Sequence, residues 1–141
     1  LTIDPACTVY LLITENANKT CLFDVNTRAI LADRGLDTHI GRVRPTVVST
    51  GSTADYAKRI DAVLLRGVRS AIDFEYEHTM AEINQRLGVS TVLIPTPGHL
   101  RHVSSSAVRE LLRIGQTAAA LDMIPESARS LLQRYYDEMS K

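Results

Sequence analysis

Tryptophan is absent from this chain of 141 residues, and two phenylalanines and five tyrosines are its only aromatic side chains. Cysteine is just as scarce. Cys7 and Cys21 show neither a CxxC motif nor the spacing of metal ligands, which argues against a disulfide framework and against a zinc site. Net charge is also lacking, because 16 basic residues balance 16 acidic ones. Without a charged tail, any site for an anion must be local.

Long apolar runs are missing as well. No stretch approaches the roughly 20 apolar residues that a membrane-spanning helix needs, and the first residues do not combine a basic region with an apolar one, as a signal peptide does. We therefore expect a cytoplasmic protein. The chain is long enough to bury one hydrophobic core and too short for two ordinary domains, so we expect a single domain over residues 1–141.

Strand-forming and helical patterns alternate along the chain. The sequence predicts strands over residues 9–13, 43–48, 61–65 and 91–94, and helices over residues 24–36, 54–60, 73–87, 105–115 and 125–135. This alternation predicts an α/β fold with a Rossmann-like parallel sheet, helices on both faces and helices at the C-terminus. Ligands of such sheets bind at the carboxyl ends of the strands.

Two of these helices carry clear boundary signals and apolar stripes. Asp24 is placed to cap the first helix, in which Val25, Ala29, Ile30 and Leu36 are expected to face inward. In the helix over residues 73–87, apolar side chains recur at helical spacing, and Gly88 closes the helix. We expect this stripe to face the core: Ile72, Tyr76, Met80, Ile83 and Leu87.

Three consecutive serines precede an apolar helical pattern. Ser104, Ser105 and Ser106 offer hydroxyls and unpaired backbone N–H groups at a helix start, where the helix dipole favours an anion, and Arg109 follows about one turn later. The alternative is a plain serine N-cap with no ligand, since serine is a preferred capping residue.

A second basic segment follows the predicted strand over residues 61–65. In Arg66-Gly67-Val68-Arg69, two guanidinium groups flank a glycine, an arrangement that suits phosphate oxygens. The segment Asp73-Phe74-Glu75-Tyr76-Glu77 comes next, and its acids could pair with those arginines or accept hydrogen bonds from a nucleoside. The alternative is a solvated loop before an acidic first helical turn. Lys19, in the loop after the first strand, could likewise bind a phosphate or be a solvated loop lysine.

Together, in this order, these segments resemble the bacterial phosphopantetheine adenylyltransferases, from about Val9 to the C-terminal helix. The resemblance implies a nucleotidyltransferase fold and an enzyme that binds ATP and 4′-phosphopantetheine. It implies transfer of the adenylyl group to the phosphopantetheine, which gives dephospho-coenzyme A and pyrophosphate, with Mg²⁺ on the leaving pyrophosphate. It also implies a homo-hexamer. Nucleic acid and membrane are not expected as partners.

The same resemblance assigns ligand contacts by motif position, although Leu100, Arg101 and His102 stand where the family usually has aromatic side chains. The residues implied to contact 4′-phosphopantetheine are Lys19, Ser52 and Arg66. Those implied to contact ATP are Gly67, Val68, Arg69, Glu77, Leu100, Arg101, His102, Val103, Ser104, Ser105, Ser106 and Arg109. No residue is assigned as a metal ligand or as catalytic.

The family's Gly-Thr-Phe-Asp-Pro loop and Thr-x-Gly-His motif precede the region that this sequence matches. Thr96-Pro97-Gly98-His99 has the letters of the second motif, but it follows the fourth predicted strand, and we do not expect His99 to replace the family's histidine. We expect an adenylyltransferase whose first strand, loop and helix lie upstream of Leu1. The alternatives are a nucleotide- or coenzyme-binding module that lost catalysis with that unit, and an interaction domain without a ligand.

Overall fold

The structure, a computed structural model, describes residues 6–15, 21–36, 43–48 and 51–139. The chain divides into two compact units, one of Leu1–Ser49 with Ser104–Lys141 and the other of Thr50–Val103, and each is described by itself. The described strands form two parallel pairs flanked by helices, β1 with β2 and β3 with β4. The α/β class with parallel strands is confirmed, whereas the single domain stays a prediction.

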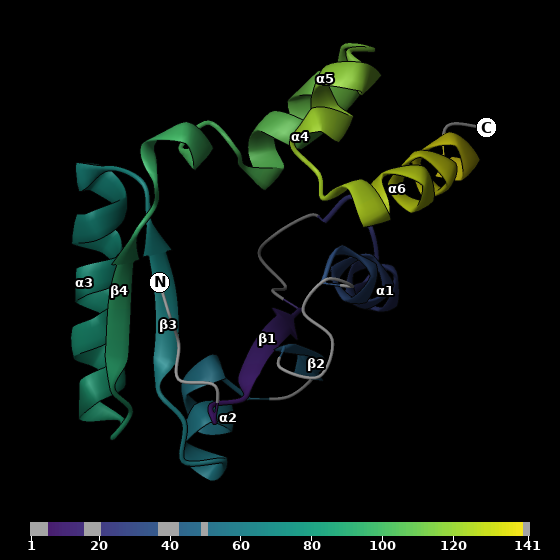
Figure 1. Cartoon of the computed structure of the whole chain (residues 1–141). Helices are drawn as coiled ribbons and strands as arrows, with labels where there is room; N and C mark the ends of the chain where they lie inside the picture. The colour runs from purple at the N-terminus through teal and green to yellow at the C-terminus, as the bar shows by residue number, and fades with distance from the viewer. Residues whose placement is uncertain (1–5, 16–20, 37–42, 49–50, 140–141) are drawn as a thin grey trace. The chain divides into compact units, whose positions relative to one another are not determined.

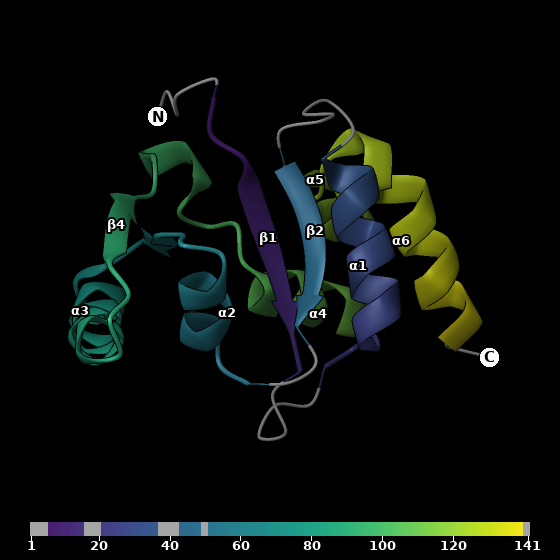
Figure 2. The same ribbon diagram turned by 90° about the horizontal axis from the view of Figure 1, so that it is seen from below.

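The first unit contains the β1–β2 pair. β1 (Val9–Thr14) and β2 (Val43–Val48) pair in parallel without a break in register. Helix α1 (Val25–Gly35) connects them, and the Asp24 side chain accepts a hydrogen bond from the Thr27 N–H at 2.8 Å, which confirms the expected cap. Figure 2 shows β1 and β2 side by side, with α1 next to β2 and α6 (Glu126–Met139) next to α1.

The first unit also has a helical core. Val108 and Leu112 of α4 (Ser105–Arg113) are buried against Ala120 of α5 (Thr117–Asp122), and the Tyr136 hydroxyl of α6 donates to the Leu112 carbonyl at 3.0 Å. Helix α5 was not predicted, although its alanine run favours a helix. None of the described helices has the length and apolar character to cross a bilayer.

The second unit is built around the β3–β4 pair. Its elements in chain order are α2 (Thr53–Arg59), β3 (Leu64–Val68), α3 (Ala71–Arg86), β4 (Thr91–Pro95) and the short 3₁₀ helix η2 (Gly98–Leu100). The two strands are parallel, and α3 runs alongside them (Figure 1). Three buried residues form the core of this unit: Ala54, Ala57 and Val89.

The prediction for the third strand was wrong by three residues. β3 begins at Leu64, whereas Asp61 lies in a turn with a φ of 51°. The reason is strand pairing, which the local sequence does not show: Arg66 lies opposite Leu93 and Gly67 opposite Ile94. The Arg66-Gly67-Val68 segment is therefore part of a strand and not of the loop after it.

The expected inward face of α3 was wrong at every position except Met80, which is half-buried. Ile72 is 81 % exposed and Tyr76 62 % exposed, and Ile83 and Leu87 are exposed too. Two polar side chains of α3 find partners in the strands instead. Glu77 accepts from Arg66 of β3, and the buried Asn84 donates to the Thr91 hydroxyl of β4 at 3.1 Å.

Ile30 of α1, likewise expected to face inward, is 49 % exposed. Its neighbours Ala29 and Leu31 are less exposed than Ile30 and lie on the covered side of this short helix. The other three residues expected to face inward, Val25, Ala29 and Leu36, are half-buried, so the expected face of α1 was wrong only at Ile30.

Candidate functional site

A bidentate salt bridge holds Arg66 against Glu77. The guanidinium donates from Nε to Oε2 at 2.7 Å and from Nη2 to Oε1 at 2.8 Å. These hydrogen bonds are the main reason why the pKa of Arg66 is raised above its ordinary value. The Arg66 Nη1 atom forms no hydrogen bond with the described residues, so part of this guanidinium is available to a ligand.

Arg69 is held in a similar way, one residue after β3 ends. Its backbone N–H and its Nε both donate to Oδ2 of Asp73, at 3.3 and 3.1 Å. The Ser70 hydroxyl accepts from the Asp73 N–H at 3.1 Å and caps α3. Of the two roles that the sequence left open for these acids, pairing with the arginines is seen for Asp73 and Glu77.

Gly67 lies between the two arginines and leaves open space at the end of β3. Among the described residues, a Cβ atom there would meet only the Thr96 Oγ1, at an ordinary 3.9 Å, so packing against them does not require glycine. The Thr96 N–H donates to the Val68 carbonyl at 2.8 Å and ties the carboxyl ends of β3 and β4 together. This strand end can thus admit a ligand close to the backbone.

The residues after β4 form tight turns that the sequence did not predict. The Leu100 N–H donates to the Pro97 carbonyl at 2.9 Å, which closes η2, and the Val103 N–H donates to the Leu100 carbonyl at 3.0 Å. Leu100, Arg101 and His102 are exposed. The second unit, Thr50–Val103, carries these of the expected ATP contacts: Gly67, Val68, Arg69, Glu77, Leu100, Arg101, His102 and Val103.

The serine segment begins helix α4, as expected. The Ser104 hydroxyl accepts from the Ala107 N–H at 3.1 Å, so this serine is the N-cap. Ser105 and Ser106 are exposed, and Arg109 donates from Nη2 to the Ser106 hydroxyl at 3.1 Å. These four residues belong to the first unit, and the structure describes them separately from the strand end that carries Arg66 and Arg69.

Ser52 has a local role at the start of α2. Its hydroxyl accepts from the Asp55 N–H at 3.1 Å, and Asp55 Oδ2 accepts from both the Ser52 N–H and the Ser52 hydroxyl, at 2.9 and 2.8 Å. This capping box lowers the pKa of Asp55. The contact of Ser52 with substrate stays a prediction, and Lys19 lies outside the described residues.

Arg28 is a feature that no sequence pattern indicated. From α1 it donates through Nη1 to the carbonyl of Thr14, the last residue of β1, at 3.0 Å. Its Nε is buried and has no hydrogen-bond partner among the described residues. A cation therefore lies at the carboxyl end of β1. The same described ranges contain no group of three histidine, cysteine, aspartate or glutamate side chains that could hold a metal ion.

The comparison with known proteins agrees with the motifs. A phosphopantetheine adenylyltransferase of Porphyromonas gingivalis is 39 % identical over 127 residues, which cover 84 % of this chain and 76 % of the relative. The chain belongs to the phosphopantetheine adenylyltransferase family. Another member, from Bifidobacterium longum, is 35 % identical over 127 residues, or 88 % of this chain and 75 % of that protein.

The phosphopantetheine adenylyltransferase of Bacteroides fragilis matches a shorter stretch more closely, with 50 % identity over 62 residues, 43 % of this chain and 41 % of the relative. No family model matches the chain. The resemblance to phosphopantetheine adenylyltransferases found in the sequence is thus confirmed by curated relatives.

Proposed function

We propose that this protein transfers the adenylyl group of ATP to 4′-phosphopantetheine and releases dephospho-coenzyme A and pyrophosphate. Relatives named for this activity support the proposal. The structural observation that carries it is the end of β3, where Arg66 and Arg69 flank the open backbone of Gly67 and each is fixed by a carboxylate of α3. Fixed guanidinium groups beside exposed backbone suit ligands that bear phosphate.

Catalysis of this reaction depends mainly on how the two substrates are positioned. A phosphate oxygen of the acceptor attacks the α-phosphorus of ATP in line. A bond forms between this oxygen and the α-phosphorus, and the bond between the α-phosphorus and the pyrophosphate leaving group breaks. No covalent intermediate with the protein is required. Cations and N–H groups that are already oriented stabilise the charge as it moves to the leaving group.

The proposed division of residues follows the family motifs. Arg66, with Lys19 and Ser52, orients the phosphate of 4′-phosphopantetheine. Arg69 and the start of α4, with Ser104, Ser105, Ser106 and Arg109, bind the triphosphate. The other proposed ATP contacts are Gly67, Val68, Glu77, Leu100, Arg101, His102 and Val103.

We propose that Mg²⁺ binds together with ATP. The carboxylates of Asp73 and Glu77, the acids beside the arginines, already accept hydrogen bonds from Arg69 and Arg66. We therefore assign Mg²⁺ to the phosphate oxygens of ATP, where it neutralises the leaving pyrophosphate. We further propose that the enzyme acts in the cytoplasm and as a homo-oligomer, a hexamer by resemblance to its family.

ATP protection against unfolding tests the site. At a hundredfold excess over Kd, a ligand that binds only the native state adds about 2.7 kcal/mol to its stability. We expect ATP to raise the midpoint of thermal unfolding and Arg69→Ala to remove most of that rise. Arg86→Ala is the matched control, since this exposed arginine at the end of α3 forms no ion pair with the described residues. Full protection in the Arg69 variant would refute the assignment.

Activity is tested separately on the full-length protein. Pyrophosphate release is measured with ATP alone, with 4′-phosphopantetheine alone and with both. We expect release only when both substrates are present. Release without the acceptor, or none with both substrates, would contradict the proposed reaction.

A further inference from the structure

The first unit contains a cavity that the proposed reaction does not use. It lies where the start of α1 meets the end of α6, two elements of the same unit, and its volume is about 390 Å³. Cavities of this size accommodate small molecules. The described residues that line it are not among the expected contacts with ATP or with 4′-phosphopantetheine. A ligand of this cavity would therefore be a different compound.

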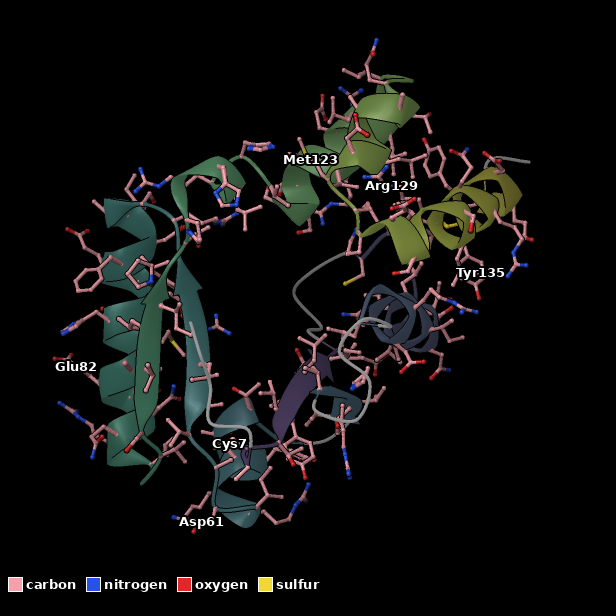
Figure 3. All side chains as sticks on the ribbon, viewed as in Figure 1. Cys7, Asp61, Glu82, Met123, Arg129 and Tyr135 are labelled. Atoms are coloured by element: carbon pink, nitrogen blue, oxygen red, sulfur yellow. The ribbon has the colours of Figure 1, made fainter. Side chains whose placement is uncertain are left out.

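Two aromatic rings line this cavity. Phe23 precedes α1, and Tyr135 lies on the side of α6 that is turned toward α1 (Figure 3). The ring centroids are 6.3 Å apart and the ring planes are tilted by 56°, so the rings meet at an angle instead of stacking. The thioether of Met139 lies in the same lining. Such a wall suits methyl and methylene groups, and the face of an aromatic ring also attracts a cation.

Two carboxylates line the same cavity. Asp24 accepts from the N–H and from the hydroxyl of Thr27, at 2.8 and 3.1 Å, and these hydrogen bonds lower its pKa, so it is ionised at neutral pH. Glu138 is exposed and forms no hydrogen bond or ion pair with the other described residues. Its charge is therefore available to a ligand.

No cation of the described residues fills the cavity. Arg28 attracts Asp24 through space, but its guanidinium donates to the carbonyl of Thr14 and it does not line the cavity. The Arg134 guanidinium lies 5.4 Å from the centroid of the Tyr135 ring, and Arg134 does not line the cavity either. The lining thus combines two negative charges with aromatic rings and, among the described residues, has no basic side chain.

We propose that this cavity binds a small organic ammonium ion, that is, a cation whose charge is surrounded by methyl or methylene groups. The carboxylates of Asp24 and Glu138 attract its charge, and the rings of Phe23 and Tyr135 contact its alkyl groups. A divalent metal ion fits less well, because it requires more oxygen ligands than two carboxylates supply and the rings offer none. In a phosphocholine lipid the phosphate lies close to the ammonium, so the carboxylates favour a free ammonium compound over a lipid head group.

Three related compounds test the chemistry of the ligand. The full-length protein, labelled with ¹⁵N, is titrated with choline, with 3,3-dimethylbutan-1-ol and with phosphocholine, while sodium chloride keeps the ionic strength constant. 3,3-Dimethylbutan-1-ol has the shape of choline without its charge. We expect choline to cause saturable shifts of the amide signals of Phe23 and Thr27. The Kd values of the neutral alcohol and of phosphocholine should each be at least about fivefold higher than that of choline.

Substitutions test the residues. Tyr135→Leu removes a ring and should raise the Kd for choline about fivefold, whereas Tyr135→Phe keeps the ring and should stay within about twofold of the wild type. Glu138→Gln and Asp24→Asn each remove one charge and should raise this Kd about threefold; asparagine at position 24 still caps α1. Asp137→Asn is the matched control, because Asp137 is exposed and next to Glu138 but does not line the cavity. Its Kd should stay within about twofold.

Four results would overturn the inference. The first is an absence of saturable binding of choline to the wild type. The second is equal binding of the neutral alcohol, which would make the cavity an apolar site without preference for charge. The third is tighter binding of phosphocholine, which would indicate a lipid head group, and the fourth is an equal loss in Asp137→Asn and Glu138→Gln, which would indicate general surface charge. The comparison of ligands uses the wild type alone, so it holds even if Tyr135→Leu fails to fold. No nucleotide is present, so the result is independent of the proposed reaction.

Discussion

Removing single hydroxyls from the serine segment should separate the folding role of these residues from ligand binding. In Ser104→Ala, the Ala107 N–H loses the capping oxygen that it now reaches at 3.1 Å. Loss of a serine N-cap typically costs about 1 kcal/mol. For a chain of this size, that corresponds to a fall of roughly 3 to 4 °C in Tm.

Ser105→Ala removes the neighbouring hydroxyl, which is exposed and forms no hydrogen bond with the described residues. Alanine also favours the helix more than serine does. Without ligand, we therefore expect the free energy of unfolding to change by less than about 0.5 kcal/mol. With ATP, Ser105→Ala should show reduced protection, because we assign its hydroxyl to the triphosphate.

The assay is urea unfolding of both variants, followed by circular dichroism with and without ATP. We expect the loss of ligand-free stability to be confined to Ser104→Ala. Equal destabilisation of the two variants, or an unchanged Ser104→Ala, would show that Ser104 is not the cap that the geometry indicates. Normal ATP protection in Ser105→Ala would remove this hydroxyl from the proposed site.

Two further predictions concern the second unit. Gly88 has a φ of +84° just after α3, so Gly88→Ala should lower the free energy of unfolding in urea by about 1 to 2 kcal/mol. Gly98 has no positive φ, and no atom of the described residues lies within 4 Å of a Cβ added there, so Gly98→Ala should leave stability unchanged. Equal losses in the two variants would contradict the backbone argument. Hydrogen bonds from Ser52 lower the pKa of Asp55 from its ordinary value of 3.8. The ionised carboxylate therefore stabilises the fold fully above pH 3.8, and this stabilisation is lost as the pH falls through the lowered pKa. Between pH 6 and pH 2, the urea midpoint of Asp55→Asn should fall less than that of the wild type, and an equal fall in the two proteins would refute this.

Signals that act over a few residues were read correctly from the sequence. Asp24 caps α1, Gly88 follows the end of α3, and α4 begins at Ser105. Each depends on the backbone conformation or on a hydrogen bond within one turn, so the local sequence contains the information. The contacts of the expected ligand motifs with ATP and 4′-phosphopantetheine stay predictions.

Features set by distant residues were not predictable in the same way. β3 begins at Leu64 because its partners lie in β4, about 27 residues further on. The face that α3 turns to the strands depends on whether Glu77 and Asn84 find partners, and Arg66 and Thr91 supply them. An apolar stripe is a sound guide only when the competing polar face has no such partners.

The strand location of Arg66-Gly67-Val68 makes this motif sensitive to a kind of change that leaves all its letters intact. Successive residues of a strand point to opposite sides, so deleting one residue between Asp61 and Leu65 could shift the pairing with β4 by one position. Arg66 would then turn away from Glu77, and Gly67 would face α3. A homologue with such a deletion would still match any search for the motif, and yet its guanidinium would be on the wrong side of the sheet. The number of residues before the motif is therefore as informative as the motif itself when other members of this family are compared.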